Sequence, residues 1–340
     1  RSTLDRSSAA SDVYKRQAVG GGTGNHTTLS GLRGLDCNLA AVVAMTDSGG
    51  SSGRLRDEMG HLPPGDLRQC LIALASSDHS GEIMKKLFDY RFNAGNGLAG
   101  HNFGNLLLTA LTEITGNTVT AIEEASRLLG IEGSVLPVTL TDATLVAKLA
   151  DGSELAGESA IDLRNERLDV KIDYVRLEPK AYVYPPVLEV IAGADAIVLG
   201  PGDIYTSVLP NLLVANVAEA INDSGAIKIH VCNLMTKPAE SNGFKASDFV
   251  RLLLEYLGTD KPLDYMVVNS TQFPEPLLER YAADGQYPVE LDHDNCVGLV
   301  NEVLFKPVLA AGVYLRHDPN ALAQIIMDAV SSNTPQGTNI

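Results

Sequence analysis

The stretch from Ala18 to Thr27 joins a short apolar run to closely spaced glycines and polar side chains. Glycines let the backbone turn sharply and approach a ligand closely, and the free N–H groups of a following helix N-terminus favour phosphate oxygens. The stretch therefore predicts a nucleotide-binding turn between a strand and a helix. The fit to the dinucleotide fingerprint is partial, because Asn25 stands where a third glycine is expected, so a glycine-rich turn without a ligand remains the alternative. The candidate ligand contacts are Gly21, Gly22, Thr23, Gly24 and Asn25.

A second polar segment, from Asp47 to Arg68, is rich in glycine, serine and proline. Arginine is concentrated in it although the chain is acidic, and guanidinium groups, serine hydroxyls and glycine N–H groups can together bind an anion. Asp47 also lies where dinucleotide-binding folds place an acid against a ribose hydroxyl. A solvated linker is the alternative for so long a loop. The candidate contacts are Asp47, Ser48, Gly49, Gly50, Ser51, Arg54, Asp66 and Arg68.

Three further polar loops open helices or follow predicted strands. The first spans 93–105, where a structural histidine and a helix cap at Asn102 are the alternatives to ligand contact. The other two follow the predicted strands 194–199 and 226–231. Together these loops supply the candidates His101, Asn102, Asn105, Gly200, Pro201, Gly202, Asp203, Thr206, Ser207, Asn233 and Thr236.

The side chains shared by these loops suit phosphate groups and sugar hydroxyls better than a nucleophile or a metal cage. Since a parallel sheet brings several such loops to one edge, a nucleotide or a nucleotide sugar is the predicted ligand. The sequence contains no GxSxG, HExxH or Walker lysine motif, so no catalytic residue is assigned. No metal is required, but Asp47, Asp66 and Asp203 have the oxygen ligands that suit Mg²⁺ if one binds.

Composition excludes several classes of function. The formal net charge of −16 argues against non-specific binding to nucleic acid or to anionic membranes. The four cysteines are widely spaced and form no zinc-ligand pattern, which is typical of buried thiols in a reducing compartment. No apolar run reaches the ~18 residues of a membrane span. We therefore expect a cytoplasmic protein without a membrane span.

Alternating helical and strand patterns predict the elements that position these loops. Helices at 26–35, 67–75, 81–92, 106–114, 117–130, 186–192, 207–222, 246–257 and 320–330 alternate with strands at 37–45, 194–199, 226–231 and 265–269. This order predicts an α/β Rossmann-like fold with a doubly wound, mostly parallel sheet. We divide the chain into a nucleotide-binding half at 18–133, an antiparallel β insert at 134–178 with a hairpin at Asp151-Gly152, and a second half of the same domain at 179–332.

The two ends are treated separately. Residues 1–17 are polar and basic and directly precede the glycine turn, where four to six apolar residues would be normal, so we interpret them as a non-native leader. A transit peptide is the alternative. Residues 333–340 are expected to form a flexible tail.

Taken together, the loops resemble the bacterial gluconeogenesis-factor (YvcK-type) family, whose fold is shared with 2-phospho-L-lactate transferase. The resemblance runs from about Ala18 to Ala329. It is carried by GGGTG at 20–24, DSGGSSGRLR at 47–56, PPGDLR at 63–68, GNGLAGHNFGNLLL at 95–108, GPGDIYTSVLPNLLV at 200–214 and CNLMTKPAES at 232–241.

The resemblance implies a CofD-like regulator that binds UDP-N-acetylglucosamine and acts on carbon metabolism, cell-wall synthesis and cell shape, with cell-wall enzymes as partners. It also points to Tyr281 and Arg316 as sugar-nucleotide contacts, since a tyrosine can stack on a base or sugar and an arginine can bind a diphosphate. A Mg²⁺-dependent nucleotide-linked transferase is the rival hypothesis. An NAD-binding protein is the third, and a homodimer is expected because dimers are common for such folds.

Overall fold

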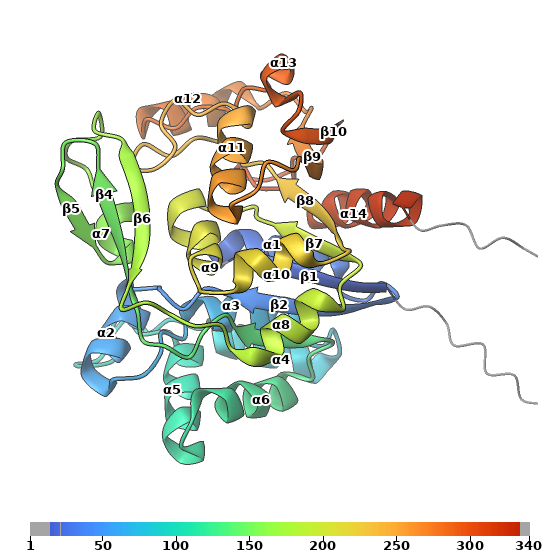
Figure 1. The fold of residues 1–340 in the computed structure, drawn as a ribbon. Helices are drawn as coiled ribbons and strands as arrows, with labels where there is room; N and C mark the ends of the chain where they lie inside the picture. The colour runs from blue at the N-terminus through green and yellow to red at the C-terminus, as the bar shows by residue number, and fades with distance from the viewer. Residues whose placement is uncertain (1–13, 21, 334–340) are drawn as a thin grey trace, which may run out of the picture.

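The computed structural model describes residues 14–20 and 22–333 of the chain. A 7-stranded parallel sheet forms its centre, and helices cover both faces (Figure 1). The predicted α/β doubly wound fold with a small antiparallel insert is confirmed. The strands of the large sheet are β1 (Tyr14–Gly20), β2 (Cys37–Val43), β3 (Ser134–Pro137), β7 (Ala196–Leu199), β8 (Ile227–Val231), β9 (Leu263–Asn269) and β10 (Val300–Lys306).

The strand order is β10-β9-β8-β7-β1-β2-β3. The chain winds outward from β1 to β3, then returns to β7 beside β1 and winds outward in the opposite direction to β10. The winding therefore reverses between β1 and β7, which pair in parallel with Ala18 opposite Val198. In open α/β sheets, ligands bind outside the carboxyl ends of the strands at such a reversal point.

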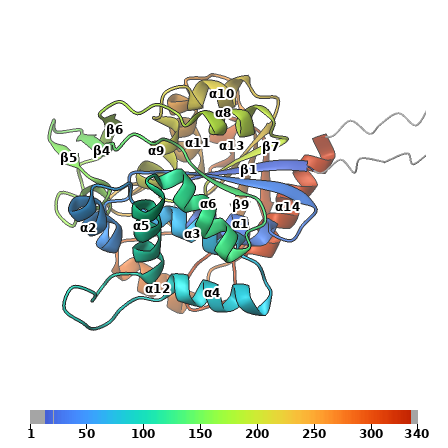
Figure 2. The same cartoon turned by 90° about the horizontal axis from the view of Figure 1, so that it is seen from below.

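The helices form one layer on each face, and the layer around α3 is covered by a further one (Figure 2). One face carries α1 (Gly22–Leu32), α3 (Gly65–Leu74) and α14 (Pro319–Asn333), with α4 (His79–Asp89), α5 (Phe103–Thr115) and α6 (Thr118–Leu129) outside α3. The other face carries α8 (Pro185–Ala192), α9 (Leu209–Leu212), α10 (Val217–Asp223) and α11 (Ala246–Leu257). With both faces covered, β7 is buried along its whole length.

The insert is a 3-stranded antiparallel sheet that projects beside α2 (Figure 1). Its elements are β4 (Thr144–Leu149), β5 (Glu154–Ala156), the short α7 (Glu158–Asp162) and β6 (Ile172–Glu178). The hairpin at Asp151-Gly152 is confirmed, with Gly152 at a φ of 87°. The expected start of the insert at 134 is wrong, because β3 pairs in parallel with β2 as the edge strand of the large sheet.

Other boundaries also differ from the expectations. The predicted loop at 47–68 contains α2 (Gly50–Met59), and α1 begins at Gly22 rather than at His26. The predicted helix 207–222 is broken into the π-helical turn η1 (Ile204–Val208), α9 and α10, with Asn216 at a φ of 75° before α10. The elements β10, α12 (Glu275–Ala283) and α13 (His293–Cys296) were not predicted.

At the N-terminal end, β1 begins at Tyr14, so residues 14–17 of the predicted leader lie in a paired strand. Residues 1–13 of that leader and residues 334–340 of the predicted tail lie outside the described residues. The four cysteines are free thiols, as expected. In the part of the chain that the structure describes, no helix is both long and apolar enough to span a membrane.

Candidate functional site

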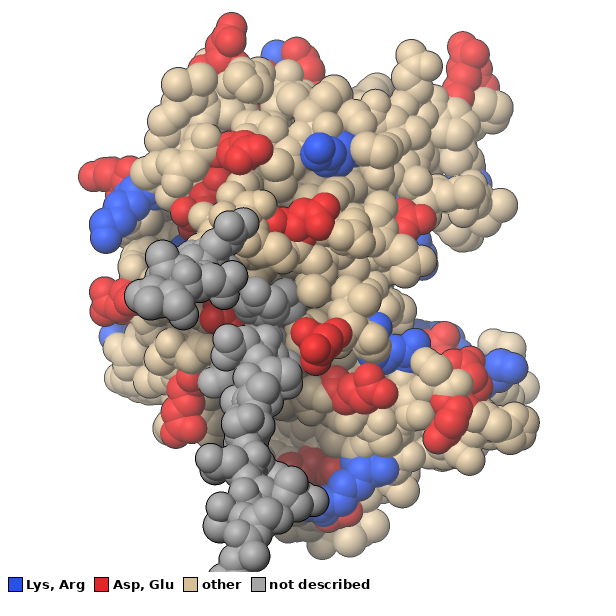
Figure 3. Space-filling model, turned by 90° about the vertical axis from the view of Figure 1, so that its right-hand side faces the viewer, with Lys and Arg blue, Asp and Glu red and all other residues tan. Residues whose placement is uncertain are grey.

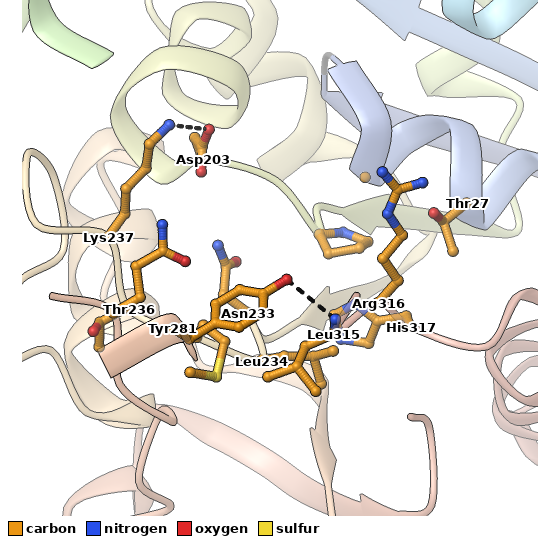
Figure 4. Close-up of a pocket in the computed structure, with 14 residues that line it drawn as sticks. Thr27, Asp203, Asn233, Leu234, Thr236, Lys237, Tyr281, Leu315, Arg316 and His317 are labelled. Atoms are coloured by element: carbon orange, nitrogen blue, oxygen red, sulfur yellow. Dashed lines mark hydrogen bonds and ion pairs between the residues drawn. The ribbon is translucent and has the colours of Figure 1, made fainter. Parts of the chain in front are cut away.

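A cleft of about 310 Å³ lies at the carboxyl ends of β1, β7 and β8, where the winding of the sheet reverses (Figure 4). Its walls come from α1, from the loops after β7 and β8, from α12 and from the segment before α14. The lining residues are Gly24, Thr27, Pro201, Asp203, Asn233, Leu234, Met235, Thr236, Lys237, Tyr281, Gln286, Leu315, Arg316 and His317. The cleft thus gathers Gly24, Pro201, Asp203, Asn233, Thr236, Tyr281 and Arg316 from the sequence-predicted contacts.

The glycine turn contributes to the cleft through close backbone packing. A Cβ on Gly24 would lie 1.9 Å from the carbonyl oxygen of Pro201, so glycine is needed where the loops after β1 and β7 meet. Asn25 is buried and donates a hydrogen bond from Nδ2 to Cys70 Sγ at 3.6 Å, away from the cleft lining. Gly22 and Thr23 lie in the first turn of α1, and Gly21 lies outside the described residues.

The loop after β7 has its backbone donors satisfied by a protein carboxylate. The N–H groups of Tyr205 and Thr206 donate to Glu240 Oε2 at 2.9 and 3.2 Å, and Thr206 Oγ1 donates to Glu240 Oε1 at 2.8 Å. Asn233 Nδ2 donates to the Gly202 carbonyl at 2.9 Å and ties this loop to the next one. Thr206 therefore binds Glu240 and does not line the cleft, and Ser207 lies in η1 behind it.

Lys237 places an ammonium group among three carboxylates at one end of the cleft. Its Nζ lies 2.7 Å from Asp203 Oδ2 and 3.7 Å from Glu240 Oε1, and it also pairs with Asp162 of α7. Burial raises the pKa of both Asp203 and Glu240, and the charge of Glu240 raises that of Asp203 further, while the Lys237 ammonium favours the charged form of Glu240. Ligand atoms of Asp162, Asp203 and Glu240 lie within 4.8 Å of one another, so Lys237 supplies the positive charge that a metal ion would bring there.

The acids predicted to hold Mg²⁺ also share an electrostatic neighbourhood. Asp66 and Glu158 both raise the pKa of Asp203, after the larger effect of burial. Burial and the charge of Asp47 raise the pKa of Glu158, which belongs to α7 of the insert. Asp47 Oδ1 accepts a hydrogen bond from the Gly49 N–H at 2.9 Å. The sequence identified three of these acids and missed Glu158.

The remaining predicted contacts form hydrogen bonds among α2, α3, α5 and the insert instead of lining the cleft. The Ser51 hydroxyl lies 3.0 Å from His101 Nδ1, and burial lowers the pKa of His101. Asn102 caps α5, as expected, with Oδ1 accepting from the Gly104 N–H at 2.9 Å. Further pairs are Ser48 with Ser159, Arg54 with Ala99, Arg68 with Asp89, and Asn105 with Ser52, while Gly49 and Gly50 begin α2.

Tyr281 and Arg316 both line the cleft, one from α12 and the other from the segment before α14. Tyr281, on α12, accepts a hydrogen bond at Oη from the Leu315 N–H at 3.1 Å. Arg316 comes directly after Leu315, and its side chain extends toward α1 and Thr27 (Figure 4). Its charge lowers the pKa of His26, whose pKa is lowered mainly by burial. A guanidinium group, a phenol and a helix N-terminus thus surround the same space.

Comparisons with known proteins show the family of this chain. The sequence profile of the family described as 2-phospho-L-lactate transferase CofD matches residues 17–309. The chain is 37% identical over 311 residues to the gluconeogenesis factor of Bacillus subtilis, covering 91% of this chain and 96% of that one. It is 38% identical over 314 residues to the gluconeogenesis factor of Halalkalibacterium halodurans, covering 91% and 94%. The chain belongs to the gluconeogenesis-factor branch of the CofD family.

A solved structure supports the same fold. A crystal structure of a UPF0052 family member from Bacillus halodurans superposes with a TM-score of 0.87 at 36% identity, covering 93% of this chain and 99% of that chain. The family resemblance drawn from the loop motifs is therefore confirmed. The cleft residues Thr27, Lys237, Gln286 and His317 were missed, although Lys237 and Glu240 lie within a motif that carried the resemblance.

Proposed function

We propose that this CofD-family protein binds a UDP-sugar, UDP-N-acetylglucosamine in particular, and acts as a cytoplasmic regulator of carbon metabolism and of cell-wall synthesis and cell shape. The observation that carries the proposal is the cleft at the reversal point of the sheet, where Tyr281 and Arg316 meet the glycine turn of α1. A guanidinium beside a helix N-terminus suits a diphosphate, and a phenol suits a sugar or a base.

The charge distribution favours a small ligand over nucleic acid. The net charge is −16, and Figure 3 shows Asp and Glu side chains spread over one face with Lys and Arg interspersed among them. Arg316 and Lys237 both line the cleft in this acidic chain. We therefore expect the cleft to select an anionic metabolite and not a polyanion. The partners of such a regulator would be cell-wall synthesis enzymes, and we expect it to act as a homodimer.

A Mg²⁺-dependent transferase of the 2-phospho-L-lactate transferase type is the second candidate. It is supported by four acids: Glu158 and Asp66 raise the pKa of Asp203 after burial and Glu240, and Asp47 raises the pKa of Glu158 after burial. Carboxylate oxygens are the ligands that Mg²⁺ prefers, and Mg²⁺ commonly bridges a diphosphate to acidic side chains. The regulator requires no cofactor, whereas the transferase would require the metal.

Calorimetric titration of UDP-N-acetylglucosamine, with and without Mg²⁺, separates the two. A regulator should bind the nucleotide without metal and release it intact, as judged by chromatography of the recovered nucleotide. Metal-dependent binding with breakdown of the nucleotide would support the transferase. Displacement of the UDP-sugar by NAD, or absence of UDP-sugar binding, would contradict the proposal.

Arg316→Ala is the variant that tests the site itself. Removing a charge-assisted contact to the diphosphate should weaken binding by ~1.5 to 3 kcal/mol. Folding should be unaffected because Arg316 is exposed, and circular dichroism melting checks this. Arg127→Ala is the matched control, since Arg127 is exposed on α6, lies outside the cleft lining and pairs with Glu124 on the same helix. Unchanged affinity in Arg316→Ala would remove this residue from the site.

A further inference from the structure

Two surface segments beside the cleft are joined by a stack of alternating rings and guanidinium groups. The Arg280 Cζ lies 5.5 Å from the ring centroid of Tyr281 and 5.2 Å from that of Tyr314. The Arg316 Cζ lies 5.6 Å from the Tyr314 centroid on the same stack. Arg280 and Tyr281 come from α12, whereas Tyr314 and Arg316 come from the segment before α14. We call these four side chains the Arg–Tyr stack.

The members of the Arg–Tyr stack divide into two that line the cleft and two that do not. Tyr281 and Arg316 line it, while Arg280 and Tyr314 lie outside its lining. Arg280 lies within contact distance of both tyrosine rings, and the Tyr314 ring lies within contact distance of both guanidinium groups. Arg280 and Tyr314 therefore connect the two cleft residues, Tyr281 and Arg316, through side-chain contacts.

Few hydrogen bonds join α12 to the 313–316 segment in the described residues, although the backbone of that segment is itself held by a bond from the Ala310 N–H to the Arg316 carbonyl at 2.8 Å. No residue of α12 is buried, and Tyr314 is 57% exposed. Two hydrogen bonds join the segments. The Leu315 N–H donates to Tyr281 Oη, and Arg280 Nη2 donates to the Val313 carbonyl. Arg316 has no ion pair with any acid among the described residues. Its direction into the cleft thus depends on the ring of Tyr314, since a free arginine side chain samples many rotamers.

We propose that Arg280 and Tyr314 are positioning residues for nucleotide binding, holding the guanidinium of Arg316 and the phenol of Tyr281 in place to receive a nucleoside diphosphate. This proposal rests on the UDP-sugar function proposed above. Neither residue touches the ligand in this arrangement. Arg280 fixes α12 to the 313–316 segment, and Tyr314 restricts Arg316 to conformations that point toward α1.

The first test is calorimetric titration of UDP-N-acetylglucosamine into the full chain and into single variants. Tyr314→Ala and Arg280→Ala should each weaken binding about three- to thirtyfold, the range expected from loss of a cation–π contact. Tyr314→Phe should bind within about twofold of wild type, because the ring is kept. The matched control is Tyr182→Ala, since Tyr182 is 61% exposed and lies 5.7 Å from Lys180 Nζ in a similar contact outside the cleft lining.

The second test separates positioning from direct contact. If Tyr314 acts through Arg316, then adding Tyr314→Ala to Arg316→Ala should cause no further loss of affinity. Additive losses would show an independent contact and overturn the positioning role, as would wild-type affinity in Tyr314→Ala. Melting temperatures of all variants should stay near that of wild type, because both residues are exposed. Absence of binding by the wild-type protein would instead reject the UDP-sugar function itself.

Discussion

At the scale of single residues, the Lys237 ammonium is the charge that allows three acids to lie close together. It is shared by Asp162 of the insert, Asp203 after β7 and Glu240 after β8. These acids come from segments far apart in the sequence, so the ammonium also links the insert to the core of the domain. Removing one partner of such a group leaves uncompensated buried charge.

Lys237→Ala should therefore destabilise the protein and allow a cation to bind between the three acids. We expect the free energy of unfolding to fall by ~3 kcal/mol, and added Mg²⁺ or Ca²⁺ to restore part of it, because the acids have ligand atoms within 4.8 Å of one another. Thermal unfolding with and without each ion measures this. Lys148→Ala is the control, as the side chains of Lys148 and Glu154 are 30% and 43% exposed and loss of their pair should cost less than ~1 kcal/mol. Equal responses to the ions in wild type and Lys237→Ala would contradict the argument.

Gly24 presents a purely steric requirement. An added Cβ would lie 1.9 Å from the Pro201 carbonyl oxygen, so Gly24→Ala must push apart the loops after β1 and β7. We expect a loss of stability of at least ~1 to 3 kcal/mol, the usual cost of overpacking, together with loss of UDP-sugar binding. Urea denaturation and calorimetry report the two effects. Gly225→Ala, where the added Cβ would meet nothing within 4 Å, should leave both unchanged.

At the scale of elements, the sequence predicts the helices and strands that are specified by their own residues, through apolar periodicity and end caps. The helix α11 has the predicted bounds because its apolar residues recur at helical spacing and Gly258 ends it at a φ of 66°. The helix α2 was missed because its glycines and serines have poor helix propensity. Its buried Ser51 and Ser52 are held instead by His101 and by Asn105, about fifty residues away. Such tertiary contacts leave no periodic signal.

The cleft residues divide in the same way into those that neighbouring sequence predicts and those whose role depends on residues far away in the chain. The glycine turn was predicted from its closely spaced glycines and the loop after β7 from the apolar strand before it, and the parallel order places them together. Lys237 and Glu240 were missed because their role depends on Asp203 and Thr206, which lie in another loop. Glu158 was missed because nothing in the sequence shows that the insert folds back over Asp47.

The cap of α5 provides a prediction for a single element. Asn102 Oδ1 accepts hydrogen bonds from the N–H groups of Gly104 and Asn105 at 2.9 and 3.4 Å, and the side chain is buried. Asn102→Ala should lower the free energy of unfolding by ~1 to 2 kcal/mol, because those donors lose their partner. Chemical denaturation measures the change. Asn117→Ala, at the exposed cap of α6, should cost less, and a larger loss there than at Asn102 would contradict this ranking.

At the scale of the whole molecule, the parallel sheet buries titratable groups at the edge where the cleft forms. Burial raises the pKa of Asp203 and of Glu240. It lowers the pKa of His230 to about 4 and that of His317 also to about 4. The two classes act oppositely on stability as the pH falls. The folded protein holds extra protons on the acids, which favours folding in acid, whereas the neutral histidines favour unfolding in acid.

His317 allows the histidine contribution to be measured separately. An unfolded histidine takes up a proton below its ordinary pKa of 6.5, whereas folded His317 stays neutral down to about 4, so its stabilisation is lost as the pH falls through this interval. The loss is ~3 kcal/mol over the full interval. His317→Gln keeps a donor for the Cys232 carbonyl, which lies 3.1 Å from Nε2, and removes the titration. Urea denaturation at pH 7, 6, 5 and 4 should therefore show wild type losing stability more steeply than His317→Gln. Parallel pH profiles for the two proteins would exclude His317 as a source of acid sensitivity.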